Sequence, residues 1–168
     1  MKRLFLLRHA ESGWGKPNQD DFDRTLSMRG KRTAPLLGRH MQRLGYAPAI
    51  ALCSPAQRTR ETWGYVSKAL DSETPEELRP EFYLVEPGTL LDAIRTLEDA
   101  HASAIVINHN PGILALALGL ATDDIRAANP FGEYPAAALA VFDFDVASWS
   151  ALQPGGGTLI GFTHPDEL

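Results

Sequence analysis

Cysteine is nearly absent from this sequence: Cys53 is the only one among 168 residues, so no disulfide can form within the chain. A lone cysteine is typical of proteins in reducing compartments. The sequence also lacks any stretch of about 18 apolar residues, which excludes a transmembrane helix. The first apolar run, Leu4 to Leu7, is too short for the apolar region of a signal peptide. We therefore expect a cytoplasmic protein with no membrane partner.

Positive charge is scarce as well. The chain has 16 Lys and Arg against 21 Asp and Glu, a net charge of -5, and no basic stripe, which argues against a nucleic-acid partner. The five histidines show no HExxH pattern or paired-ligand spacing, and one cysteine adds little to a zinc site. We therefore expect neither a metal nor a cofactor. The histidines are His9, His40, His101, His109 and His164.

Short apolar segments alternate with segments of helical periodicity, which predicts an α/β fold with a mostly parallel sheet. The hydrophobic content of 44% suffices for one core, and no linker is evident, so we expect one domain over residues 1–168. The predicted strands are residues 4–7, 49–54, 81–85, 104–107, 138–144 and 158–162. The predicted helices are residues 27–44, 55–70, 88–99 and 111–121, while 71–77 reads as a connection and 122–126 as a solvated charged run.

Polar groups follow three of the predicted strands. Arg8 and His9 end the first strand, Ser54 begins the segment that contains Arg58, and His109 follows the strand at 104–107. Because parallel strands end at one edge of a sheet, these groups should converge there, beside two helix N-termini. The arginine fork and the helix N-termini both favour a phosphoryl group. The long loop at 13–24 leaves directly from this edge and should border the site.

A neutral imidazole can attack phosphorus and form a phosphohistidine, while flanking cations stabilise the charge of the transition state. Two arginines beside His9 should lower the pKa of its ring and keep it nucleophilic near neutral pH. A metal is then not required for the chemistry.

The segment Leu6-Leu7-Arg8-His9-Ala10-Glu11-Ser12 resembles the signature of the histidine phosphatase superfamily, which includes the phosphoglycerate mutases. The resemblance continues through the motifs at 23–30, 54–62 and 109–112, and the short chain is similar to the SixA-type branch. It implies a three-layer α/β/α sandwich of the phosphoglycerate mutase type with His9 as nucleophile. By the same resemblance Arg8, Arg58 and His109 form the phosphate pocket, and Ser12 and Asn110 are further substrate contacts.

The resemblance leaves the substrate open, because relatives that act on phosphoesters use a carboxylic acid to protonate the leaving group. Glu86 and Glu11 are the candidate acids here. The first interpretation is a phosphatase acting on phosphohistidine in a protein, whose leaving group needs less help from an acid. The alternatives are a phosphomonoesterase acting on a small molecule and a non-catalytic module that binds phosphoproteins; a mutase is disfavoured by the short chain. The expected partner is a phosphoprotein or a small phosphorylated substrate, and the oligomeric state stays open.

Overall fold

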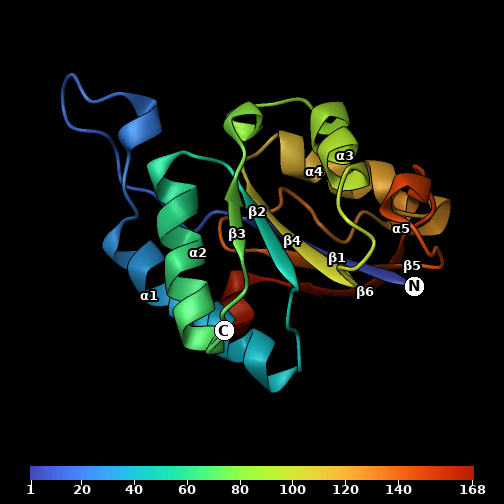
Figure 1. The fold of residues 1–168 in the computed structure, drawn as a ribbon. Helices are drawn as coiled ribbons and strands as arrows, with labels where there is room; N and C mark the ends of the chain where they lie inside the picture. The colour runs from blue at the N-terminus through green and yellow to red at the C-terminus, as the bar shows by residue number, and fades with distance from the viewer.

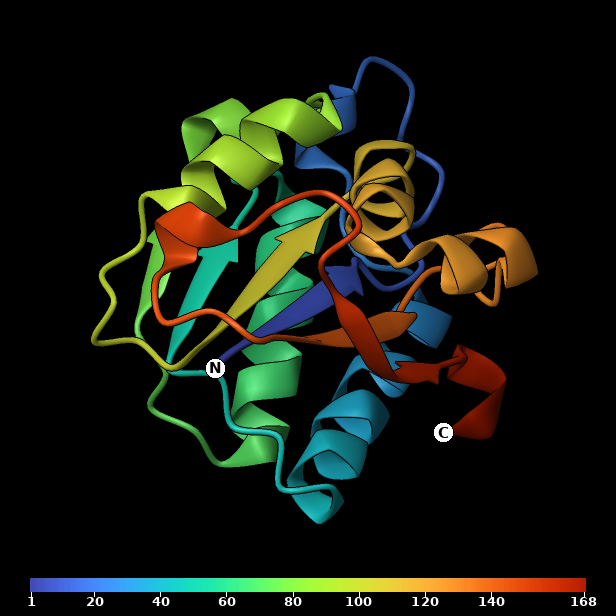
Figure 2. The ribbon, with the colours of Figure 1, turned by 90° about the vertical axis from the view of Figure 1, so that its right-hand side faces the viewer.

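The computed structural model describes residues Met1–Leu168, which form one six-stranded sheet with helices on both faces (Figures 1 and 2). The strands lie in the order β3-β2-β4-β1-β5-β6. The pairings among β3, β2, β4 and β1 are parallel, and β5 and β6 add two antiparallel pairings. The prediction of a mostly parallel sheet is therefore confirmed. The strands are β1 (Lys2–Arg8), β2 (Ile50–Cys53), β3 (Glu76–Leu78), β4 (Ser103–Asn108), β5 (Leu139–Phe144) and β6 (Thr158–Thr163).

The helices form two layers. In Figure 1, α1 and α2 cover one face of the sheet, and α3, α4 and α5 lie on the other side. This is the three-layer α/β/α sandwich that the resemblance implied. None of the helices combines the length and the apolar character that a membrane span requires. The helices are α1 (Met28–Arg43), α2 (Gln57–Leu70), α3 (Pro87–Arg95), α4 (Gly112–Leu120) and α5 (Asp123–Ala128).

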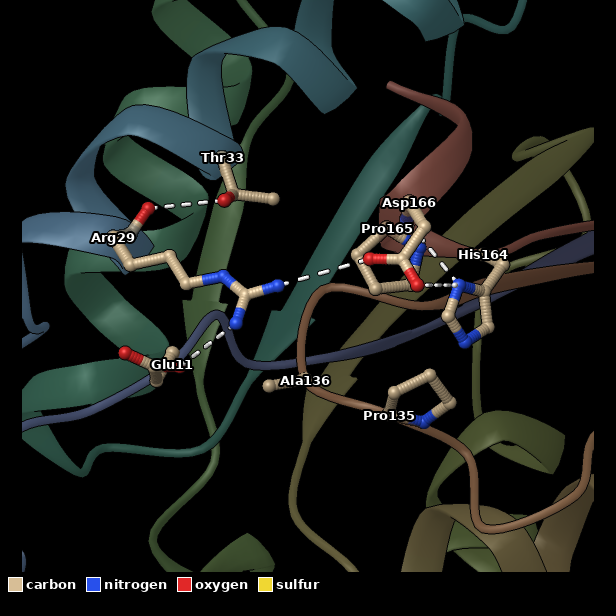
Figure 3. A pocket seen from close by; sticks show the side chains of 8 residues that line it. All are labelled: Glu11, Arg29, Thr33, Pro135, Ala136, His164, Pro165 and Asp166. Carbon is tan, nitrogen blue, oxygen red and sulfur yellow. Dashed lines mark hydrogen bonds and ion pairs between the residues drawn. The ribbon is translucent and has the colours of Figure 1, made fainter.

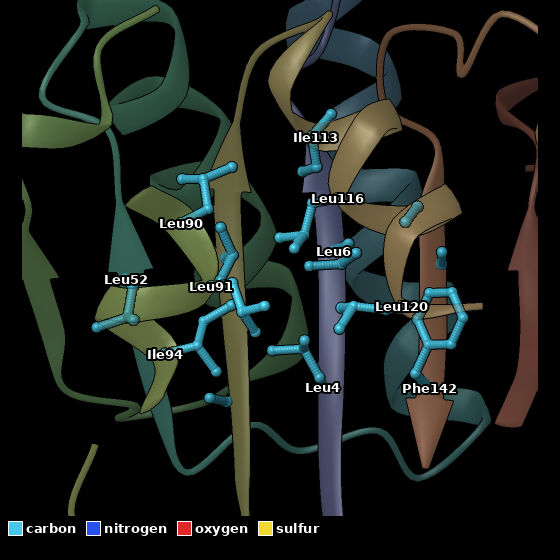
Figure 4. Packing of buried hydrophobic residues seen from close by; sticks show 14 of the residues in the cluster. Leu4, Leu6, Leu52, Leu90, Leu91, Ile94, Ile113, Leu116, Leu120 and Phe142 are labelled. Atoms are coloured by element: carbon cyan, nitrogen blue, oxygen red, sulfur yellow. The ribbon is translucent and has the colours of Figure 1, made fainter. Parts of the chain in front are cut away.

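The central strand β1 is apolar at successive positions because both of its faces are covered. Leu4 and Leu6 point into the cluster that α3 and α4 complete, as Figure 4 shows. Phe5 and Leu7 point the other way, into the cluster beneath α1 and α2. All four side chains are at most 1% exposed. Such burial on both faces is the reason that a parallel strand reads as a continuous apolar run.

Local sequence signals place most of the remaining elements. The Ser27 hydroxyl accepts a hydrogen bond from the Gly30 backbone N–H at 3.1 Å and so caps α1, as its position before the periodic segment predicted. Gly38 lies where α1 crosses α2, and a Cβ there would collide with the Val66 carbonyl oxygen. The glycine thus permits the close approach of the two helices that cover this face.

Two sequence predictions are wrong. The strand predicted at residues 81–85 does not form, since Pro80–Phe82 is a single 3₁₀ turn and Leu84 has a left-handed φ of 49°. The strand that pairs with β2 is instead Glu76–Leu78, in the segment predicted as a connection. The charged run that begins at Thr122 is exposed, as predicted, with no fully buried residue, and it forms the short helix α5. Ile125 anchors this helix by packing on the core.

Candidate active site

The ends of three parallel strands meet at one edge of the sheet, as the sequence predicted. Arg8 of β1 is in register with Asn108 of β4, and Cys53 of β2 is in register with Ile107. Backbone hydrogen bonds continue the ladder one residue beyond the strands: the His9 N–H donates to the Asn108 carbonyl at 3.0 Å. Since His109 directly follows Asn108, the register brings the two histidines together. Their ring centroids lie 5.2 Å apart.

His9 is buried, with only 8% of its surface exposed. Its Nδ1 lies 2.7 Å from the Ala10 carbonyl oxygen, which can only accept a hydrogen bond. In the neutral ring, Nδ1 therefore carries the hydrogen and Nε2 keeps its lone pair. Burial lowers the pKa of His9 to about 4, and the positive charges of Arg58, Arg8 and Arg24 act in the same direction. The ring is thus neutral at physiological pH, with a nucleophilic nitrogen.

His109 is held in a similar state. The ring is 3% exposed, and its Nε2 lies 2.7 Å from the Ser54 hydroxyl. Burial lowers the pKa of His109 to about 3, and the charges of His9, Arg58 and Arg8 contribute. Nδ1 of His109 is buried and has no partner within the protein. A buried polar atom without a protein partner is a candidate contact for a bound water molecule or a ligand.

Arg8 is fixed by the segment that precedes β5. Its Nη1 donates to the Tyr134 carbonyl oxygen at 2.8 Å, while its Nε is buried without a protein partner. The Asn110 side-chain amide donates to the same carbonyl at 3.2 Å and to the Glu133 carbonyl at 2.8 Å. Asn110 therefore holds the backbone that positions Arg8. Its remaining oxygen is an acceptor, which is the wrong polarity for a phosphate oxygen.

Arg58, in the first turn of α2, is only 4% exposed. Its Nη1 donates to the Asp21 carbonyl oxygen at 2.7 Å, and its Nη2 donates to the Asp21 carboxylate at 3.1 Å. Tyr83 donates its hydroxyl hydrogen to the same carboxylate at 2.6 Å. Hydrogen bonds from Tyr83, Arg24 and Arg58 lower the pKa of Asp21 to about 2. An ionised carboxylate therefore fixes the guanidinium whose charge acts on both histidines.

Comparisons with known proteins agree with this geometry. The family model of the histidine phosphatase superfamily (branch 1) matches residues 4–86. An uncharacterized protein of Mycobacterium tuberculosis is 31% identical over 163 residues, which cover 95% of this chain and 99% of that protein. A structure from Agrobacterium tumefaciens, named as a SixA phosphohistidine phosphatase, has a TM-score of 0.85 at 27% identity and covers 98% of both chains. The chain belongs to the histidine phosphatase superfamily, in its SixA-type branch.

A further solved structure, of the protein histidine phosphatase SixA complexed with tungstate, superposes with a TM-score of 0.79 over 98% of both chains. At 22% identity this likeness shows the fold alone. An uncharacterized chloroplastic protein of Arabidopsis thaliana is 30% identical over 177 residues, covering 98% of this chain and 78% of that protein. The histidine phosphatase fold therefore extends over the whole chain, beyond the residues that the family model matches.

The loop after β1 contributes residues to this histidine phosphatase site that sequence reasoning did not single out. Arg24 donates to the Asp21 carboxylate at 2.9 Å and to the Ser12 hydroxyl at 2.8 Å. Ser12, a predicted substrate contact, thus serves to hold Arg24. The sequence carried two signals here: the length of the loop and its departure from His9 predicted that it would border the site, and Arg24 lies in the motif at 23–30. Neither Asp21 nor Tyr83 belongs to a motif that would have marked it.

Glu11, one of the two candidate acids, belongs to a separate cavity of about 260 Å3 (Figure 3). Its carboxylate accepts a hydrogen bond from the Ser27 hydroxyl at 2.7 Å and lies 3.8 Å from the Arg29 guanidinium. Asp166, near the C-terminus, faces the same guanidinium from the other side at 3.7 Å. Glu11 therefore links β1 to the start of α1 and to the C-terminal segment.

Glu86, the other candidate acid, directly precedes α3. It lines a cavity of about 250 Å3 together with His109, so it lies on the same side of the molecule as the histidine pair. No hydrogen bond fixes its carboxylate within the protein. Of the two acids predicted from the sequence, Glu86 is thus the one that shares a cavity with a residue of the phosphate pocket.

Proposed function

We propose that this protein is a metal-independent phosphatase that removes the phosphoryl group from phosphohistidine in another protein, with His9 as the nucleophile. The observation that carries the proposal is the state of the His9 ring. Its Nδ1 is tied to the Ala10 carbonyl and its pKa is about 4, so Nε2 presents a lone pair at neutral pH. Two arginines beside this nitrogen supply the charge that a phosphoryl group needs.

In the proposed first step, Nε2 of His9 attacks phosphorus while the bond from phosphorus to the substrate imidazole breaks. The departing imidazole nitrogen takes a proton from water, and the phosphoryl group stays on His9. Arg8 and Arg58 neutralise charge on the phosphoryl oxygens during the transfer. In the second step water attacks phosphorus, the bond to His9 breaks, and inorganic phosphate leaves. This step regenerates the free enzyme with a neutral His9.

The acidic groups near the site support a phosphohistidine substrate. Asp21 is the carboxylate bonded to Arg58, and its pKa of about 2 keeps it ionised at neutral pH, so it has no proton to donate. Glu11 is engaged with Ser27 and Arg29 in another cavity. An alkoxide leaving group needs a proton from an acid. A departing imidazole is a better leaving group and tolerates a site without a strong acid.

One observation favours a second candidate function, hydrolysis of a small phosphoester. Glu86 lines the cavity that His109 also lines, and its carboxylate is free of other bonds within the protein. A substrate whose ester oxygen entered this cavity would meet the Glu86 carboxyl group there. The two functions differ in which substrate is turned over and in whether Glu86 is needed.

A turnover assay with chelator present separates these functions. We expect the wild type to hydrolyse a phosphohistidine peptide and the phosphoramidate ion faster than a panel of alkyl phosphates. His9→Ala should abolish turnover, because no phosphoenzyme can then form, and Glu86→Gln should have little effect. His101→Ala, at a partly exposed histidine outside the site, serves as the matched control.

A radiolabelled phosphoryl donor provides the second readout. The label should be attached to the wild-type protein through a bond that is labile in acid but stable in base. It should be missing from His9→Ala. Turnover by His9→Ala equal to that of the wild type would refute the nucleophile. Faster turnover of alkyl phosphates, lost in Glu86→Gln, would instead establish the phosphoesterase. Binding of phosphopeptide without any turnover would establish a non-catalytic module.

A further inference from the structure

An apolar cavity adjoins the phosphate pocket. It has a volume of about 250 Å3 and is lined by Leu84–Pro87, His109–Gly112 and Ala115; we call it the side cavity. Because His109 belongs to both, a group in the side cavity lies directly beside the phosphoryl group. The side chains of Leu84, Val85 and Ala115 and the two prolines make its wall largely apolar.

The volume of the side cavity limits what it can hold. An apolar cavity of about 150 Å3 binds benzene, whereas sites for drug-sized ligands begin at about 300 Å3. The side cavity lies between these sizes. It is therefore suited to one apolar side chain, as large as that of leucine or phenylalanine, rather than to an extended ligand.

Leu84 forms the outer rim of this cavity, and both its backbone conformation and its exposure are energetically unfavourable. Its backbone has a φ of 49°, a region that favours glycine and asparagine, and 58% of its surface is exposed. Neither the strained backbone nor the exposed apolar side chain stabilises the fold. Neighbours on both sides fix the segment, since Tyr83 is bonded to Asp21 and Pro87 begins α3. Strain that the surrounding structure imposes in this way is a mark of a binding position.

The apolar surface continues beyond the side cavity. Phe22, 38% exposed, packs edge-to-face against Tyr83 with ring centroids 5.1 Å apart. Tyr83 in turn meets His109 at 5.8 Å. Exposed apolar side chains thus flank the site on the side of the loop as well as on the side of α3. A small phosphoester would leave this surface uncovered, whereas a protein segment carrying the phosphoryl group would cover it.

We propose that the side cavity binds an apolar side chain next to the phosphohistidine of the protein substrate. The proposal rests on the proposed function and adds a preference: the enzyme selects phosphohistidines that have an apolar neighbour within two residues. The phosphoryl group and this side chain are then held at once, on either side of His109. Burial of the apolar group contributes binding energy that inorganic phosphate cannot supply.

The test compares two phosphohistidine peptides of equal length. One has leucine at the two positions on each side of the phosphohistidine, and the other has serine at those positions. We expect the wild type to prefer the leucine peptide by about tenfold in kcat/KM, which lies at the lower end of what complete burial of a leucine supplies. The phosphoramidate ion has no apolar group that could occupy the side cavity. Its turnover therefore measures whether the phosphate pocket is intact in each variant.

Two variants then alter the side cavity independently. Ala115→Leu fills it from α4, and Leu84→Asn removes its apolar rim with a residue that accepts a left-handed backbone. Both should reduce the ratio of the two kcat/KM values towards one. Ala127→Leu, at an exposed alanine of α5, is the matched control and should keep the wild-type ratio. Because the two variants differ in mechanism, failure of one to fold leaves the test intact.

Equal kcat/KM values for the two peptides in the wild type would overturn the proposal. So would a ratio that survives in both Ala115→Leu and Leu84→Asn. If the wild type released phosphate from neither peptide, the proposed function itself would fail, which is distinct from equal cleavage of both. Cleavage of 2-naphthyl phosphate that is lost in Ala115→Leu would show that the cavity takes the leaving group of a small ester instead.

Discussion

The two imidazoles of the site, His9 and His109, lie side by side, and the charges of Arg8 and Arg58 act on both. In the unfolded chain both rings would bind a proton below about pH 6.5, whereas in the folded protein their pKa values are about 4 and about 3. The unfolded state therefore binds more protons between these values. The contribution of the neutral pair to the free energy of unfolding is complete above pH 6.5 and is lost as the pH falls through about 4 for His9 and about 3 for His109.

The low pKa of His9 can be measured by an NMR titration of its Cε1–H resonance. We expect the shift to stay constant from pH 8 to pH 5 in the folded protein and to change near pH 4, because burial and the arginine charges disfavour the imidazolium. The same resonance should titrate near pH 6.5 in protein unfolded with urea. A folded-state inflection near pH 6.5 would contradict the neutral, nucleophilic state on which the proposed mechanism depends.

At the scale of elements, the site depends on a short 3₁₀ turn, Asp21–Asp23, which lies within the loop after β1 and contacts α2. Figure 1 shows this loop standing clear of the sheet beside the start of α2. Asp21 ties the turn to Arg58 on α2 and to Tyr83 on the segment before α3. Three segments far apart in the sequence are thereby joined at one carboxylate, which fixes the orientation of the guanidinium.

Asp21→Asn tests whether this tie positions Arg58. The substitution keeps the size of the side chain but removes the charge that orients the guanidinium. We expect kcat for the phosphoramidate ion to fall about tenfold with a smaller change in KM, the scale of one hydrogen bond to a charged group. Asp20→Asn, at the exposed neighbour whose side chain makes no capping hydrogen bond, is the matched control. An increase in activity would mean instead that the Asp21 carboxylate competes with the phosphoryl group for Arg58.

The elements that were predicted correctly are those with a local signal. The continuous apolar runs of β1 and β4 marked buried strands, and Ser27 marked the start of α1. By contrast, β3 is made of Glu76, Glu77 and Leu78, all exposed, and its backbone pairing with β2 decides its conformation. No apolar pattern could reveal it. The site shows the same contrast. The parallel arrangement of the strands predicted that His9 and His109 would lie close together. The hydrogen bond between Asp21 and Arg58 could not be predicted, because it joins a loop without periodicity to a helix.

At the scale of the whole molecule, the phosphate pocket exists only when the fold is complete. Arg8 and His9 come from β1, Arg58 comes from α2, and His109 follows β4. Each group alone is an ordinary polar side chain. The four can contact the same phosphoryl group only because the fold brings them to one edge of the sheet. A ligand that needs all of them binds the native state and not the unfolded chain, so its binding free energy adds to the stability of the fold.

Inorganic phosphate should therefore raise the melting temperature of the wild type. At about one hundred times its dissociation constant, a ligand adds about 2.7 kcal/mol to the free energy of unfolding, and for a chain of this length that corresponds to about 5 to 10 °C. Arg58→Ala should lose most of the shift, because it removes a buried cation of the pocket. Arg60→Ala, on the exposed side of the same helix, should keep it. Potassium chloride at equal ionic strength controls for screening of surface charge. A shift of the same size in Arg58→Ala would mean that phosphate stabilises the protein at some other place.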